Sequence, residues 1–177
     1  MRKNSKFKIQ NSKLERGFTL IELILYVALV SIMLATLIPF AWSVIEGGVK
    51  IGVEQEVYSQ ARYLSERIKE EVRDASAVTV CNNTTLTLTN PVAAMSPTTF
   101  AYASNEVKIT QGTQIPAPGI RLHSIDTSIT SFACTNYTGA NTDNVQITFT
   151  LASNYPSATR KAYSESIIIE LTAETRD

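Results

Sequence analysis

The sequence predicts an α+β protein in which a long N-terminal helix, membrane-spanning and then amphipathic, packs on an antiparallel β-sheet domain. Two observations carry this prediction. Residues 18–75 change from a nearly uncharged apolar run to an apolar stripe with helical spacing. Residues 76–177 instead show short runs of alternating apolar and polar residues, separated by Asn, Pro and Gly. At 177 residues the chain is long enough for one domain and an anchor.

Charge is distributed unevenly along the chain. The whole sequence has 16 Lys and Arg and 16 Asp and Glu, which gives a formal net charge of zero. Residues 1–17 hold six of the cations and one anion, so the remainder has 10 cations against 15 anions and a formal charge of −5. This balance does not favour a protein whose main activity is binding nucleic acid, although it leaves such binding open.

The basic leader precedes an apolar segment long enough to span a membrane. Residues 18–45 contain a single charged residue, Glu22, and the next charge is Glu46. A helix needs about 20 apolar residues to cross the hydrocarbon core of a bilayer. The positive-inside rule places the N-terminus in the cytoplasm and the bulk of the chain outside, as a single-pass protein of the cytoplasmic membrane.

Three interpretations of this terminus compete. An ordinary secretory signal has a shorter apolar stretch followed by small residues at a cleavage site, and residues 35–37 (ATL) match that pattern poorly. A plain signal anchor explains the length and the basic flank but not Glu22, because carboxylates inside membrane helices are costly and usually functional. The third interpretation is a leader that is removed in front of the apolar helix.

Residues 17–22 (GFTLIE) carry that third interpretation, since they resemble the processing site of type IV prepilins and type II secretion pseudopilins. The resemblance implies that a membrane-embedded peptidase cuts after Gly17 and methylates the new amine of Phe18. The apolar helix then stays on the mature protein, with Glu22 as its fifth residue and Pro39 as its 22nd. The family's domain plan gives a leader at 1–17, a transmembrane and filament-core helix at 18–45, an amphipathic continuation at 46–75 and an extracytoplasmic β domain at 76–177.

Each motif residue has a chemical role in this interpretation. Gly17 has no side chain, so an extended backbone can lie close to a protease. The resemblance implies that Glu22 attracts the Phe18 amine of a neighbouring subunit as helices enter a filament. Pro39 lacks an N–H and clashes with the carbonyl four residues earlier, so we expect it to kink or loosen the helix. A tolerated membrane-helix proline is the alternative.

The second half of the predicted helix is amphipathic. Its opposite face is charged, with possible pairs Arg62–Glu66 and Arg67–Glu71 and a repulsive pair Glu70–Asp74, and we expect this face to be solvated. Residues 62–75 also loosely resemble J-type minor pseudopilins and W-type minor pilins. The apolar stripe, with gaps of three and four, comprises Val53, Val57, Ala61, Leu64, Ile68, Val72 and Ala75.

The β domain is expected to contain antiparallel strands joined by two turn-rich loops, at residues 112–119 and 136–144. Cys81 and Cys134 lie in the exported part, where they form either a disulfide or two free thiols. His123 is expected at the surface or half-buried. The predicted strands are 84–89, 98–103, 106–110, 119–124, 128–134, 145–151 and 166–172.

The sequence shows no nucleophile–base set, no phosphate-binding glycine loop and no metal-ligand spacing, so we expect neither an enzyme nor a cofactor. The expected function is that of a structural subunit, a minor pilin or minor pseudopilin of a type IV pilus or a type II secretion pseudopilus. Its expected partners are the prepilin peptidase and methyltransferase, other pilins, an inner-membrane assembly platform, and membrane lipid before assembly. The alternative is a membrane-anchored binding module, a pilus-tip adhesin or a DNA-uptake component.

Overall fold

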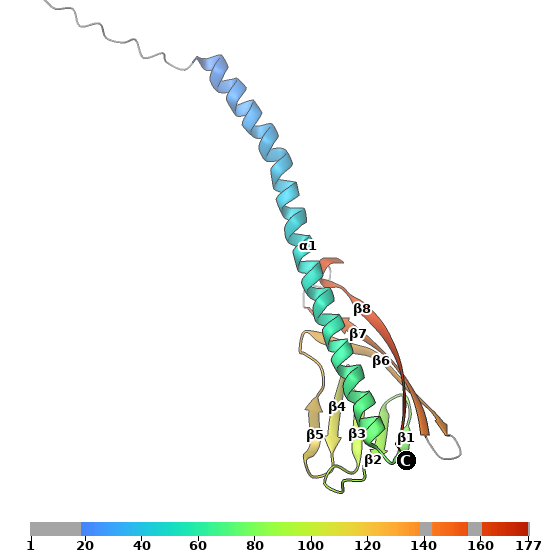
Figure 1. Ribbon diagram of the computed structural model, residues 1–177. Helices are drawn as coiled ribbons and strands as arrows, with labels where there is room; N and C mark the ends of the chain where they lie inside the picture. Colours follow the sequence, from blue (N-terminus) through green and yellow to red (C-terminus); the bar gives the residue numbers. More distant parts are fainter. Residues whose placement is uncertain (1–18, 139–142, 156–160, 177) are drawn as a thin grey trace, which may run out of the picture. The chain divides into compact units, whose positions relative to one another are not determined.

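The computed structural model describes residues 19–138, 143–155 and 161–176 of the chain (Figure 1). The chain divides into two compact units, residues 1–43 and 44–177. The elements are α1 (Leu20–Asp74), β1 (Ala77–Cys81), β2 (Thr85–Thr89), β3 (Thr98–Ala103), β4 (Glu106–Gln111), β5 (Ile115–Arg121), β6 (Thr127–Thr138), β7 (Asp143–Ser153), a short 3-10 helix η1 (Lys161–Tyr163) and β8 (Ser166–Glu174). This order confirms the predicted α+β fold.

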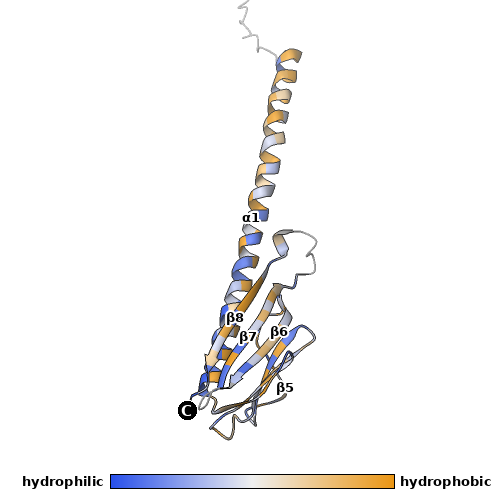
Figure 2. Ribbon diagram, turned by 90° about the vertical axis from the view of Figure 1, so that its right-hand side faces the viewer, coloured by the Kyte–Doolittle hydropathy of each residue, from blue (hydrophilic) through white to orange (hydrophobic). Residues whose placement is uncertain are grey.

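In the first unit, α1 presents side chains to solvent on every side. All residues from Thr19 to Ser43 are exposed, and most of them are apolar (Figure 2). The helix is long and apolar enough to cross a membrane. The hydroxyls of Ser31 and Thr36 donate to the carbonyls of Val27 and Met33, at 2.7 and 2.9 Å. These bonds satisfy the polar groups within the helix itself, as an apolar environment requires.

In the second unit, α1 buries the predicted stripe. All seven stripe residues are buried, and Leu64, Ile68 and Val72 have no exposed surface. All of them except Val53 pack in one cluster with apolar side chains of both sheets, Phe100 and Phe149 being the largest. Full burial of a Leu, Ile or Val side chain contributes about 1.5–3 kcal/mol each. The helix ends at Asp74, and two residues separate it from the start of β1 at Ala77.

Two antiparallel sheets complete this unit. One has the order β1-β2-β3-β4-β5 and the other β6-β7-β8. The five-stranded sheet is seen face-on in Figure 1 and the three-stranded sheet in Figure 2, so the two are turned relative to each other. Strand β2 reads TLTLT, and its alternation puts Leu86 and Leu88 in the core and the threonines outside. A two-residue turn joins β3 to β4 through Ser104 and Asn105, whose φ values of 53° and 63° are typical of hairpin turns.

Several strand predictions need correction. Strand β1 was not predicted. The loop predicted at 112–119 is largely strand β5, which ends at Arg121 rather than at 124. Its two prolines are compatible with a strand because β5 is an edge strand, where a missing N–H breaks no ladder. The loop predicted at 136–144 is shorter, because β6 runs to Thr138 and β7 begins at Asp143.

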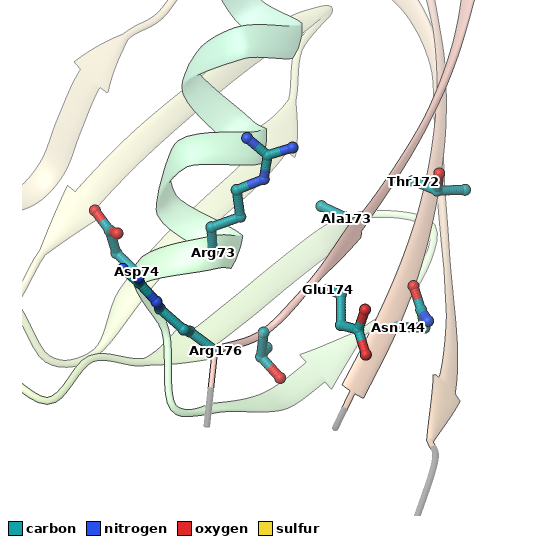
Figure 3. Close-up of a pocket in the computed structure, with 8 residues that line it drawn as sticks. Arg73, Asp74, Asn144, Thr172, Ala173, Glu174 and Arg176 are labelled. Carbon is teal, nitrogen blue, oxygen red and sulfur yellow. The ribbon is translucent and has the colours of Figure 1, made fainter. Parts of the chain in front are cut away.

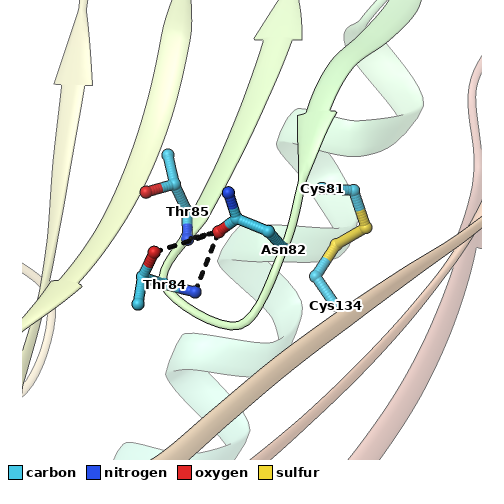
Figure 4. Close-up of a disulfide and its surroundings, with 5 residues drawn as sticks. All are labelled: Cys81, Asn82, Thr84, Thr85 and Cys134. Carbon is cyan, nitrogen blue, oxygen red and sulfur yellow. Dashed lines mark hydrogen bonds between the residues drawn. A yellow bond between two sulfur atoms is a disulfide. The ribbon is translucent and has the colours of Figure 1, made fainter.

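A disulfide joins the two sheets through Cys81 at the end of β1 and Cys134 in β6 (Figure 4). The two Cα atoms are 5.3 Å apart, within the usual range for a disulfide. In sequence, Cys134 is out of phase with Ile129, yet both side chains are buried, because a bulge between Ile129 and Ser131 changes the phase of β6. After Cys81 the chain turns at once, where Asn82 Oδ1 accepts hydrogen bonds from the N–H groups of Thr84 and Thr85 at 2.9 and 2.7 Å.

We predict that removing this disulfide destabilises the β domain by about 4 kcal/mol, because it closes a loop of 53 residues in the unfolded chain. The measurement is denaturant unfolding of the full chain in detergent, comparing the wild type with Cys81→Ala/Cys134→Ala. Adding a reductant should lower the free energy of unfolding of the wild type to that of the variant and leave the value for the variant unchanged. Equal stability of wild type and variant without reductant would contradict the prediction.

Candidate functional site

The N-terminal motif is the leading candidate site, and the structure describes it from Thr19 onward. The cleavage and methylation residues Gly17 and Phe18 lie outside the described residues. Thr19 precedes the first helical residue, and its hydroxyl accepts a hydrogen bond from the N–H of Glu22 at 3.4 Å. Its carbonyl accepts the N–H of Leu23 at 3.1 Å, the first turn of the helix. Thr19 is therefore the N-cap of α1.

Sequence analysis missed this cap, although a signal was present. Residues 19–22 read Thr-x-x-Glu, the spacing of a capping box. Glu22 lies in the first turn of α1, where the unpaired N–H groups of the helix favour a negative charge. The side chain is exposed and lies on a helix end that is otherwise apolar. The carboxylate is thus both compatible with the helix start and open to a cationic partner.

Pro39 lies inside α1, and the helix continues on both sides of it. Proline removes one amide donor from the helix, which leaves the carbonyl of Ala35 without its usual partner. Three glycines follow within the helix, and none of them has a neighbouring group within 4 Å of where a Cβ would lie. Nothing in the packing therefore requires these glycines.

Glu71 departs from the prediction of a solvated charged face. Its side chain is buried, and Oε1 accepts hydrogen bonds from Arg67 Nη2 at 2.6 Å and from Gln111 Nε2 at 2.8 Å. Burial raises the pKa of Glu71, against the opposing effects of Arg67 and Gln111. The predicted Arg67–Glu71 pair therefore exists within α1, but its carboxylate is buried and the Gln111 bond joins it to β4. By contrast, Arg62 and Glu66, 2.8 Å apart, are exposed as predicted.

His123 is also more buried than predicted. It lies in the segment that joins β5 to β6, and its side chain is only 6% exposed. Nε2 accepts the N–H of Val107 at 3.4 Å, and Nδ1 lies 3.1 Å from the carbonyl oxygen of Ser124. Burial lowers the pKa of His123, and the Arg121 guanidinium 3.3 Å away lowers it further. Arg121 in turn pairs with Glu106 at 3.0 Å, so the cluster is built to hold a neutral imidazole.

An open hollow of about 560 Å³ lies beside the C-terminal end of α1 (Figure 3). Its charged groups are of both signs, with Arg73 and Asp74 from the helix end and Glu174 and Arg176 from the C-terminal segment. The lining contains no histidine or cysteine. Within the described ranges, no three His, Cys, Asp or Glu side chains are grouped closely enough to hold a metal ion. Neither observation indicates catalytic chemistry here.

The comparisons with known proteins agree with the N-terminal site. Residues 12–38 match the family model of the prokaryotic N-terminal methylation motif. This stretch contains Gly17, Phe18 and Glu22 and ends one residue before Pro39. The match supports the resemblance of this N-terminus to the processing site of type IV prepilins and pseudopilins. No curated protein and no solved structure gives a significant match.

The buried histidine makes a pH prediction. Because the folded-state pKa of His123 is lowered from 6.5, the unfolded chain binds more protons as the pH falls below that value. We therefore expect His123 to be neutral at pH 7.5. As the pH falls below 6.5, the free energy of unfolding should decrease progressively, by at most about 1.4 kcal/mol per pH unit.

The measurement is denaturant unfolding of wild type and His123→Gln from pH 7.5 to pH 5. The free energy of unfolding of the wild type should fall relative to the variant as the pH is lowered. A constant difference between the two proteins from pH 7.5 to 5 would contradict the prediction.

Proposed function

We propose that this chain is a minor pilin or minor pseudopilin, processed between Gly17 and Phe18 and assembled through its N-terminal helix into an extracytoplasmic filament. The observation that carries this proposal is the exposure of α1 from Thr19 to Ser43, where apolar side chains cover the helix on all sides. Such a helix needs an apolar environment around its whole circumference. A bilayer supplies this before assembly, and the helices of neighbouring subunits supply it in a filament.

The methylation motif distinguishes this proposal from that of a plain membrane anchor. An anchor requires only length and apolar character, which residues 23–45 provide without Glu22. The motif adds a cleavable glycine in front of the helix and a carboxylate four residues after the new terminus. In a low-dielectric surrounding, a carboxylate and an amine attract each other more strongly than in water, and each is costly when left alone.

We infer from this pairing that Glu22 sets the axial register of the subunit. A subunit that slips along the bundle leaves its carboxylate unmatched. The prepilin peptidase and methyltransferase, an inner-membrane assembly platform and other pilins are the partners that this role requires. The β domain then lies outside the cytoplasmic membrane, an oxidising setting that suits the Cys81–Cys134 disulfide.

A membrane-anchored binding module, such as a tip adhesin or a DNA-uptake component, is the second candidate. The open hollow beside Arg73 and Arg176 offers two cations, but Asp74 and Glu174 lie in the same lining. Mixed charge of this kind does not favour a phosphate backbone. The structural role is therefore the better supported of the two.

The first test concerns processing. Gly17→Val should block cleavage, because a branched side chain prevents close approach of the backbone to the protease, while membrane insertion continues. Mass spectrometry of the protein purified from membranes should find a chain that starts at methylated Phe18 in the wild type and an intact leader in the variant. Asn11→Val, also in the leader but away from the cut, should be processed normally. Normal processing of Gly17→Val would exclude this cleavage site.

The second test concerns Glu22. Glu22→Val should be cleaved and inserted normally, because insertion depends on apolar length, but its incorporation into filaments should fall at least tenfold. Leaving a neighbour's amine without its carboxylate costs several kcal/mol by analogy with broken buried pairs. Glu22→Asp should retain partial incorporation, since it keeps the charge on a shorter side chain.

The measurement is the amount of each variant that co-purifies with the other filament subunits. Thr36→Val serves as the matched control, because Thr36 is exposed on the same helix and bonds only to its own backbone. If Glu22→Val enters filaments as well as Thr36→Val does, Glu22 is not an assembly determinant.

A further inference from the structure

The edges of the two sheets differ in how they are protected. An edge strand presents a row of unpaired N–H and C=O groups, which another strand can join. Natural proteins block this pairing with prolines, bulges or a covering segment. The two sheets described here have four edge strands, β1 and β5 in one and β6 and β8 in the other. Three of these edges carry such a device, and β8 does not.

Contacts with other parts of the unit partly cover the edges of β1 and β6. The N–H of Val78 in β1 donates to Asp143 Oδ2 at 2.9 Å, and the N–H of Ile129 in β6 donates to the carbonyl of Asn105 at 2.9 Å. The hydroxyl of Tyr102 also donates to the carbonyl of Ile129, at 3.3 Å. The pairing of each strand with its neighbour is interrupted by a bulge or irregularity, and the disulfide joins β1 to β6. These two edges are therefore partly blocked.

Strand β5 is blocked in a different way. Pro116 and Pro118 lie in its centre, and proline has no N–H to offer to a further strand. The pairing of β5 with β4 is itself irregular between Ile109 and Gln111. Gly119 has φ +84°, and a Cβ at this position would lie 2.6 Å from the carbonyl oxygen of Ile109. A regular ladder cannot continue from this edge.

Strand β8 has none of these features. Its nine residues pair with β7 in an unbroken register and contain no proline. In the part of the chain that the structure describes, no element other than β7 forms hydrogen bonds with the backbone of residues 166–173. The first half of the strand is apolar (Figure 2), and Ile168 is 71% exposed.

The register shows which backbone groups face outward. At one end of the pairing the N–H of Ser153 donates to the carbonyl of Glu165 at 2.8 Å, and at the other the N–H of Thr175 donates to the carbonyl of Asp143 at 3.0 Å. In an antiparallel ladder, bonded residues alternate with residues whose backbone groups point away from the partner. The odd-numbered residues of β8 therefore bond to β7. The even-numbered residues, Ser166, Ile168, Glu170 and Thr172, direct their N–H and C=O groups to the open edge.

The charges on β8 itself are acidic, whereas the hollow at its C-terminal end is also lined by Arg73 and Arg176. Residues 165–174 contain Glu165, Glu170 and Glu174 and no cation. Glu170 is held on the outer face of the sheet by a chain of hydrogen bonds across three strands, in which Tyr137 donates to Gln146 and Gln146 donates to Glu170. In a fully overlapped antiparallel pair of two β8 strands, Glu170 would face Glu170 of the second copy, which is unfavourable. The charge pattern favours a partner strand that carries Lys or Arg.

We propose that β8 is a docking edge, at which an extended, basic segment of another protein adds a fourth strand to the β6-β7-β8 sheet. Backbone hydrogen bonds from the even-numbered residues would provide affinity, and Glu170 would select a cation on the outer face of the added strand. The proposal concerns the β domain alone and does not depend on cleavage at Gly17 or on the role of Glu22.

The test uses synthetic nine-residue peptides as probes and the full chain in detergent micelles. One peptide alternates Val with Lys, a second alternates Val with Glu, and a third is the Lys peptide with alternate backbone amides methylated. Fluorescence anisotropy of the labelled peptides should show that the Lys peptide binds at least tenfold more tightly than either of the others. Amide exchange should slow at Ile168, Glu170 and Thr172 when the Lys peptide is bound.

Two variants of the chain complete the test. Ile168→Pro removes one outward N–H and leaves the bonds to β7 in place. It should lower the affinity for the Lys peptide at least tenfold. The matched control Ile168→Thr should bind the Lys peptide with the affinity of the wild type. Glu170→Lys keeps every backbone group and should bind the Glu peptide more tightly than the Lys peptide. This variant tests the role of Glu170 even if the proline variant unfolds.

Equal binding of the methylated peptide, an unchanged preference in Glu170→Lys or the absence of binding by all three peptides would overturn the proposal. Sedimentation of the chain without peptide tests the alternative that β8 pairs with a second copy of the chain. If the wild type self-associates through an edge that Ile168→Pro disrupts, the partner is a second copy, and the proposed basic segment is wrong.

Discussion

The β domain depends on the burial of one stripe of α1 against the two sheets. Leu64, Ile68 and Val72 are fully buried there, in one apolar cluster with residues of both sheets. The same helix is exposed on all sides in the first unit, from Thr19 to Ser43. The first part of the helix therefore suits an apolar environment and the second part suits the boundary between a protein core and water, because the sequence changes from apolar all round to apolar on one face.

Polar contacts add specificity to this packing. Glu71 and Gln60 lie on the same half of α1 and reach different parts of the sheet unit, Glu71 bonding to Gln111 and Gln60 accepting the N–H of Ser124. A buried carboxylate is costly unless its partners are in place, so the Glu71 contacts favour one rotational setting of the helix. The His123 cluster beside Ser124 holds a neutral imidazole by the same means. Both groups bond to β4, Glu71 through the Gln111 side chain and His123 through the N–H of Val107.

The proposed activities occupy separate parts of the chain. Processing and filament assembly involve the residues around the start of α1, whereas the open edge of β8 belongs to the β domain. Covering three sheet edges and leaving the fourth regular is consistent with a surface kept for a partner. In a filament subunit, a helix that assembles and an edge that docks would allow one chain to bind different neighbours through different segments.

The sequence by itself determined the long helix, its two-part character and the motif at its start, because these features are local. Charge, apolar length and a spacing of three and four are read directly from neighbouring residues, and the stripe from Val53 to Ala75 is buried as predicted. The hairpin of β3 and β4 was equally local. Only the tertiary structure decided the rest. Strand β5 accommodates two prolines because it lies at an edge, and Cys134 faces the core because a bulge shifts its phase. Glu71 and His123 are buried where they bond to β4, which is distant from Glu71 in sequence.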